Sequence, residues 1–202
     1  MPDIATVVAP LVYAVSGAQS GTLLRHYKDD ISPAARKRHT AILTLVLFNG
    51  ITLHERCIGV AAGVPVTLRV TIPSLSGRRG VHPFTAISHD IGAITDAVQL
   101  VPAPTSTSDR VVVPTQFALN PPTNLAGHHV LVLDDTWTTG ARAQSAAMTL
   151  RAAGASAVSI MVVGRWIEPG FGSNAAFIRE RLTTDFDPDR CPVTGDSCPS
   201  AQ

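Results

Sequence analysis

The chain has 202 residues, of which 45% are hydrophobic and 5% aromatic, and its formal net charge is +1. This length and apolar content are sufficient for one compact domain with a core of its own. A net charge so near zero excludes the broad basic field with which proteins hold nucleic acid or anionic lipid. We therefore expect neither direct nucleic-acid binding nor membrane association, and a charged partner must be bound locally.

The N-terminal apolar stretch, residues 1–17, reads MPDIATVVAPLVYAVSG. It contains Asp3 and two prolines, it has no basic region at its start, and it is too short to span a bilayer. The 3 cysteines are odd in number and do not form the framework of a small secreted domain. These features predict a cytoplasmic protein.

The first third of the chain has a helical pattern. Residues 22–30 resemble a short helix, and Ser32-Pro33 forms an N-cap and first-turn pair ahead of a second apolar helix over 34–48. Asn49-Gly50 suggests a break before a further helical stretch at 51–59. We predict an N-terminal helical lobe, or hood, over residues 1–63.

The pattern of the chain changes after Gly63. Residues 66–72 are β-branched and suit a strand, 75–84 a loop, 85–94 a helix, and 97–104 a strand that prolines end. The segment 110–119 is a weaker strand, because Pro114 confines it to a sheet edge or a bulge. We assign residues 64–183 to the main domain and 184–202 to a polar C-terminal tail.

The clearest pattern lies between residues 128 and 164. A near-continuous apolar run at 128–135 predicts a strand buried on both faces, an alanine-rich helix follows at 141–153 with Gly154 at its C-terminal end, and 157–164 is a second buried strand. This order is a βαβ unit, and residues 173–182 suit a late helix capped by Ser173. The predicted fold class is α/β, with a mostly parallel central sheet flanked by helices.

Two acidic residues end the first of these buried strands. Asp134 and Asp135 should face the crevice where ligands collect in open parallel sheets. The backbone N–H groups of residues 138–142 should converge at the start of the next helix, which is a seat for a phosphate. A sugar phosphate with a vicinal diol would satisfy both features, and the alternative is that the acids only cap a strand-to-helix turn.

The stretch Val130–Arg142 resembles the phosphoribosyl pyrophosphate (PRPP) signature of type I phosphoribosyltransferases: four apolar residues, two acids, two further positions and Thr-Thr-Gly. The resemblance implies that Asp134 and Asp135 are the catalytic pair and bind the ribose 2′ and 3′ hydroxyls. It implies that the turn holds the 5′-phosphate; its residues are Thr136, Trp137, Thr138, Thr139, Gly140, Ala141 and Arg142.

The signature also departs from the family pattern. Thr136 and Trp137 stand where the family usually has aliphatic residues, and Trp137 is either a core anchor or a lid over the ligand. Thr138 stands where purine-salvage members carry an aspartate that contacts the base, so hypoxanthine-guanine salvage is not expected.

A second loop could bind the pyrophosphate of PRPP. The segment 74–80, SLSGRRG, follows the predicted strand at 66–72, and its Ser74, Arg78 and Arg79 supply a hydroxyl and two guanidinium groups. The alternative is a solvated hairpin loop. Lys28 and Arg25 could reach the same site from the predicted helical lobe, although such residues are commonly surface charges.

The layout from residue 27 to residue 164 looks most like the ComF-type phosphoribosyltransferases associated with DNA uptake: an early Tyr27-Lys28, a Pro-Ser loop with an Arg-Gly pair, and then the signature. The N-terminal cysteine-rich zinc finger common in that family is missing. The resemblance implies transfer of phosphoribose from PRPP to a nitrogenous acceptor, with Mg²⁺ and release of pyrophosphate. His82 and His89 are the histidines within plausible reach, but neither is assigned as a general base.

Two other readings stay open for the same fold. One is a protein that senses PRPP or a nucleotide without catalysis, and the other is an accessory protein of DNA uptake. A homodimer is also left open.

The four residues His54, Cys57, Cys191 and Cys198 suggest a metal site. His54 and Cys57 are three apart and would share one helix face, while the two tail cysteines could complete a tetrahedral zinc site. The spacing of the tail pair is longer than that of common zinc motifs. The alternative is a tail with free thiols or a disulfide formed on oxidation.

Overall fold

The computed structural model describes residues 4–75, 80–107 and 110–199. Its centre is a sheet of four parallel strands in the order β1-β6-β5-β2, namely β1 (Val7–Val15), β6 (Ala157–Ile167), β5 (His129–Trp137) and β2 (Leu68–Thr71). The predicted strands at 66–72, 128–135 and 157–164 correspond to β2, β5 and β6. The α/β class with a parallel central sheet is therefore confirmed.

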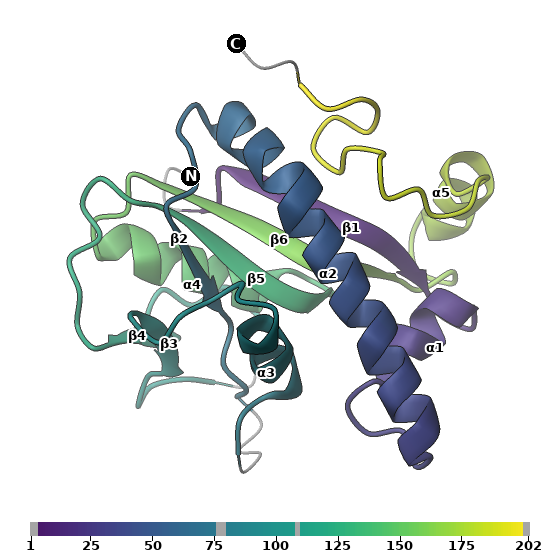
Figure 1. Cartoon of the computed structure of the whole chain (residues 1–202), viewed down its shortest axis with the longest axis horizontal. Helices are drawn as coiled ribbons and strands as arrows, with labels where there is room; N and C mark the ends of the chain where they lie inside the picture. The colour runs from purple at the N-terminus through teal and green to yellow at the C-terminus, as the bar shows by residue number, and fades with distance from the viewer. Residues whose placement is uncertain (1–3, 76–79, 108–109, 200–202) are drawn as a thin grey trace.

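Helices cover both faces of this sheet (Figure 1). On one face lie α1 (Gln19–His26), α2 (Pro33–Ala62) and α3 (Pro83–Asp90), and on the other lies α4 (Ala141–Ala152). A separate antiparallel pair, β3 (Gln99–Pro102) and β4 (Phe117–Asn120), packs on the α4 side. The last helix, α5 (Asn174–Arg181), precedes the tail and lies beyond the β1 edge of the sheet.

The alternation of side chains along β5 separates two hydrophobic clusters. Leu131 and Leu133 belong to the cluster beneath α1, α2 and α3, whereas Val130 and Val132 belong to the cluster beneath α4. All four side chains are fully buried, which is the pattern expected of a strand covered on both faces. The same alternation sends Asp134 and Asp135 toward opposite sides of the sheet.

Residues 7–15 differ from the sequence-based expectation of a helical lobe over 1–63. They form β1, which pairs in parallel with β6 from Val7 opposite Ser159 to Val15 opposite Ile167. Pro10 is tolerated because β1 is the edge strand, where a missing N–H donor need not break a ladder. The helical part of this region begins only after β1, so the N-terminal segment contributes to the central sheet.

Helix α2 is continuous over 30 residues, and the predicted break at Asn49-Gly50 does not occur. A Cβ atom on Gly50 would lie 2.4 Å from Cδ1 of Leu11, so the glycine allows α2 to approach β1 closely. The predicted start of the helix is confirmed, because the Ser32 hydroxyl accepts a hydrogen bond from the Ala35 N–H and Pro33 occupies the first turn.

Helix α2 is long and apolar enough to cross a membrane by length and composition, with a hydropathy of 1.3 in its most apolar window. In the structure one face of α2 packs against the sheet, where Leu43, Leu47 and Ile58 are fully buried, and 33% of the apolar window is buried in all. That the protein is cytoplasmic stays a prediction.

Shorter elements differ from expectation mainly at their ends. The weak strand predicted at 110–119 is reduced to β4, and Pro114 lies outside it. The helix predicted at 85–94 is α3, which ends just before Gly92, whose φ is +67°. A left-handed glycine at this point ends the helix as such residues commonly do.

Candidate functional site

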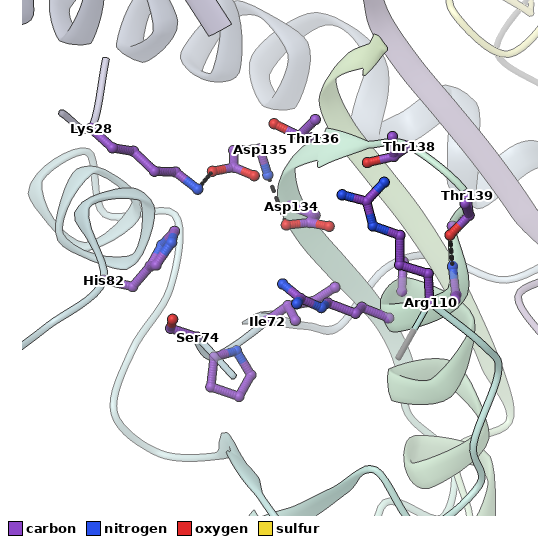
Figure 2. Close-up of a pocket in the computed structure, with 15 residues that line it drawn as sticks. Lys28, Ile72, Ser74, His82, Arg110, Asp134, Asp135, Thr136, Thr138 and Thr139 are labelled. Atoms are coloured by element: carbon purple, nitrogen blue, oxygen red, sulfur yellow. Dashed lines mark hydrogen bonds and ion pairs between the residues drawn. The ribbon is translucent and has the colours of Figure 1, made fainter. Parts of the chain in front are cut away.

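A pocket of about 270 Å³ opens where β2 and β5 end, between α1, α3 and the start of α4 (Figure 2). Most of the residues around it are polar or charged. The described lining consists of Lys28, Ile72, Pro73, Ser74, His82, Arg110, Asp134, Asp135, Thr136, Thr138, Thr139, Gly140, Ala141, Arg142 and Ala143. The structure therefore brings the predicted acidic pair, most of the predicted phosphate turn and Ser74 to one cavity.

The turn from β5 into α4 leaves backbone donors facing the pocket. Gly140 is the N-cap residue of α4 and has a left-handed backbone conformation, with φ of +76°. Ala141 N–H donates to the Thr139 hydroxyl at 3.4 Å, whereas the N–H groups of Thr138 and Arg142 have no acceptor among the described residues. Donors at the positive end of a helix form a seat for an anion.

Trp137 is placed beneath this turn and does not line the pocket. A Cβ atom on Gly140 would lie 2.1 Å from Cζ2 of Trp137 and 2.5 Å from two further ring atoms. The indole ring also packs against the α4-side cluster. Of the two predicted roles of Trp137, the structure supports an anchor, because the indole ring packs under the turn between β5 and α4.

Asp135 points to the α1 side and is held there by two groups. Its Oδ2 lies 2.5 Å from Nζ of Lys28 and accepts a hydrogen bond from the Tyr27 hydroxyl. Burial raises the pKa of Asp135, but the Lys28 charge and the hydrogen bonds from Lys28 and Tyr27 outweigh it, so the pKa lies below its ordinary value. Asp135 is thus a fixed, ionised carboxylate with 5% of its surface exposed.

Asp134 has the opposite electrostatic character. Burial, together with the negative charge of Asp135, raises the pKa of Asp134 well above its ordinary value, against the opposing influence of the Asp135 N–H, Lys28 and Arg142. Its Oδ1 accepts a hydrogen bond from the Asp135 N–H at 2.9 Å. A cation brought to the pocket would favour the ionised form of Asp134, so cation binding and proton release are coupled there.

Basic and polar side chains surround this pair of acids. Figure 2 shows Lys28 and His82 on one side of Asp134, and Arg110, Thr138 and Thr139 on the other. Arg110 was missed by the sequence analysis, because it follows β3 in an irregular segment whose path depends on tertiary packing. Of the cations considered there, Lys28 reaches the pocket and the exposed Arg25 does not.

The predicted pyrophosphate loop is described only in part. Ser74 lines the pocket, whereas Arg78 and Arg79 lie outside the described residues. His89, the second histidine considered, does not line the pocket, and its Nε2 lies 3.1 Å from the Asp96 carboxylate.

The predicted metal ligands come together at a second place. The donor atoms of His54, Cys57, Cys191 and Cys198 all lie within 4.8 Å of one another, where α2 meets the tail. None of the four lines the pocket.

No family model matches the sequence, and no curated protein matches it. Among solved structures, the chain is similar to a purine phosphoribosyltransferase from Pyrococcus horikoshii Ot3, at 14% identity over 65% of this chain and 88% of that chain, with a TM-score of 0.35. A likeness of this size is too weak to carry a conclusion about the fold or the function. The functional conclusion therefore rests on the pocket itself.

Proposed function

We propose that the protein is a type I phosphoribosyltransferase that binds PRPP in this pocket and transfers phosphoribose to a nitrogenous acceptor, releasing pyrophosphate. The observation that carries the proposal is the position of the acidic pair. Asp134 and Asp135 share one pocket with a helix start whose backbone donors at Thr138 and Arg142 have no acceptor among the described residues. A phosphate and a diol on one small molecule match these two features.

In the proposed complex the 5′-phosphate lies on the turn of residues 138–142, and the ribose hydroxyls donate to the acidic pair. Asp135 suits this role because Lys28 and Tyr27 fix its orientation before the sugar binds. The pyrophosphate then lies on the Ser74 side, toward Lys28. Arg78 and Arg79, which the sequence predicts as further pyrophosphate ligands, lie outside the described residues. The early Tyr27-Lys28 pair is the feature that favours the ComF-type family within this class.

Mg²⁺ fits this pocket as a partner of PRPP. It prefers oxygen ligands and is usually bound by one or two protein carboxylates together with phosphate oxygens of the substrate. Asp134 is the residue that would hold it, because Asp135 is already paired with Lys28. When bound, the ion would neutralise charge that develops on the pyrophosphate.

The reaction breaks the bond between ribose C1 and a pyrophosphate oxygen, and the electron pair leaves with pyrophosphate. The acceptor nitrogen forms the new bond to C1 and loses a proton. The protein contributes mainly position and charge: the turn holds one end of PRPP, while Lys28, Arg110 and Arg142 offset the negative charge of the other groups.

One observation favours a second candidate, a PRPP sensor without catalysis. The described residues that line the pocket include no Phe, Tyr or Trp, so the lining offers no such aromatic ring to stack on an acceptor base. The sugar-phosphate seat is the same in both cases. The two functions differ only in whether an acceptor reaches C1.

Calorimetric titration with PRPP and Mg²⁺ tests the seat. We expect the wild type to bind, and Asp134→Asn and Asp135→Asn each to lose about 10- to 100-fold in affinity, as for removal of a charged hydrogen-bond partner. Asp185→Asn is the matched control, because Asp185 is exposed and is not among the residues that line the pocket. Equal affinity in all four proteins would overturn the proposal.

Pyrophosphate release then separates enzyme from sensor. Protein that binds PRPP is incubated with ammonia and with a panel of nitrogenous bases. Release that depends on the acceptor and is lost in Asp134→Asn supports transfer, whereas PRPP binding without release from any acceptor supports sensing.

A further inference from the structure

Three cysteine thiols and one histidine imidazole lie together where the C-terminal tail packs against α2. His54 and Cys57 lie one turn apart on α2, and Cys191 and Cys198 come from the tail. His54 and Cys57 are each 3% exposed and Cys191 is fully buried, while Cys198 lies at the surface. Segments more than 130 residues apart in the sequence thus bring four metal-binding side chains within 4.8 Å of one another.

We propose that His54, Cys57, Cys191 and Cys198 bind one structural zinc ion that fastens the tail to α2. Three cysteines and one histidine are a common ligand set of closed tetrahedral zinc sites. Sulfur and nitrogen ligands placed tetrahedrally around zinc at about 2.0–2.3 Å lie roughly 3.5–3.8 Å apart. The observed separations, 3.4 Å between Cys198 Sγ and His54 Nδ1 and at most 4.8 Å overall, need only small adjustments to reach that geometry.

The orientation of His54 suits a zinc ligand. Its Nε2 lies 2.8 Å from the carbonyl oxygen of Pro188, which fixes the proton on Nε2. Nδ1 is then the unprotonated nitrogen, and it faces Cys198 Sγ inside the group. Metal-bound histidines characteristically donate their other ring N–H to a carbonyl or carboxylate in this way.

The tail is folded so that its two cysteines converge. Cys191 N–H donates to the Asp196 carbonyl at 2.7 Å, Gly195 N–H donates to the Cys191 carbonyl at 2.8 Å, and Gly195 is left-handed with φ of +80°. This closed loop explains how a pair seven residues apart, wider than common zinc motifs, can supply two ligands to one ion.

A structural role follows from the number and place of the ligands. Four protein ligands leave no open position for substrate, and none of the four lines the PRPP pocket. A disulfide would use two of the three thiols and leave a thiol and an imidazole together in the same buried group. Zinc provides a partner for all four at once.

Metal content of protein purified under reducing conditions without chelator is the primary test. We expect about one zinc ion per chain, and less than about one-tenth in Cys198→Ser and His54→Gln. Ser197→Ala and His128→Gln are matched controls, since the first changes the neighbouring exposed tail residue and the second an exposed histidine whose ring contacts Thr67. Zinc below one-tenth per chain in the wild type, or equal zinc in all variants, overturns the proposal.

Two measurements on the wild type keep the test valid if a variant fails to fold. Cobalt that replaces zinc should give the intense visible absorption of a tetrahedral thiolate site, and octahedral-type spectra would contradict the site. Zinc removal by chelator should also make tryptic cleavage after Arg190 at least about tenfold faster, because the tail loses its attachment. Unchanged cleavage after complete zinc removal refutes the fastening role, and PRPP binding measured in parallel is independent of that outcome.

Discussion

Substitution of Gly140 by alanine tests how the phosphate turn is built. Gly140 has φ of +76°, and a Cβ atom there would lie 2.1 Å from Cζ2 of Trp137. The left-handed conformation costs a non-glycine residue about 1–2 kcal/mol, and forcing a methyl group against a packed ring costs about 1–3 kcal/mol. We therefore expect Gly140→Ala to lower the free energy of unfolding by about 2–5 kcal/mol, or Tm by about 4–20 °C.

Gly127→Ala separates the two contributions. Gly127 has a similar φ of +81°, but nothing lies within 4 Å of its Cβ position, so this variant reports the backbone cost alone, about 1–2 kcal/mol. A double-mutant cycle with Trp137→Leu isolates the ring contact, because leucine lacks the ring atoms that the new Cβ would meet. Gly140→Ala should then cost about 1–3 kcal/mol less in the Trp137→Leu background than in the wild type.

Urea unfolding followed by circular dichroism measures these differences, and PRPP titration measures their effect on the seat. Because the ring contact lies under the phosphate turn, Gly140→Ala should also weaken PRPP binding, whereas Gly127→Ala should not. If Gly140→Ala and Gly127→Ala destabilise the protein equally and the cycle shows no coupling, the indole does not support the turn and the reasoning is wrong.

The remaining predictions concern two buried ionisable residues, Asp135 and His129. Lys28→Met should raise the pKa of Asp135 and weaken PRPP binding most at low pH, where Asp135 is then protonated. Lys37→Met, at an exposed position of α2, is the control. Equal pH profiles of PRPP binding in the two variants would contradict the pairing of Lys28 with Asp135. Burial lowers the pKa of His129 below its ordinary 6.5, so above that pH both folded and unfolded states are neutral and stability is at its full value. As pH falls below 6.5 the unfolded state takes up a proton first and stability declines. Urea unfolding at a series of pH values should show this decline in the wild type and a smaller one in His129→Gln, and identical slopes would refute it.

The sequence was sufficient for the elements whose signals are local. The apolar run of β5, the glycine turn and the alanine-rich α4 each follow from adjacent residues, so the turn between β5 and α4 was predicted at its correct place. Strand β1 was not predicted, because its pairing with β6 joins residues about 150 positions apart and its sequence includes a proline. Tertiary pairing decided what the local pattern left open.

The same distinction holds for the sites. Arg110 reaches the pocket from an irregular segment, and no periodic pattern marks such a residue in advance. The group of His54, Cys57, Cys191 and Cys198 was suggested by chemistry alone, since only the packing of the tail on α2 brings the two pairs together. The chemical type of a side chain indicated which residues could bind a ligand or a metal, and the fold determined which of these residues lie close together.

The two acids of the signature are adjacent in the chain but are not equivalent in space. Strand alternation turns Asp135 to the α1 side, where Lys28 and Tyr27 hold it ionised, and leaves Asp134 on the α4 side beside the phosphate turn with a raised pKa. A single acid at the end of the strand could not be held by Lys28 and Tyr27 and also respond to a cation in the pocket. In the proposed complex the pair would divide these tasks, with Asp135 supplying a permanent charge for the sugar and Asp134 ionising as a cation arrives. This division gives a physical reason for a doubled acid at a strand end, which a simple capping role does not require.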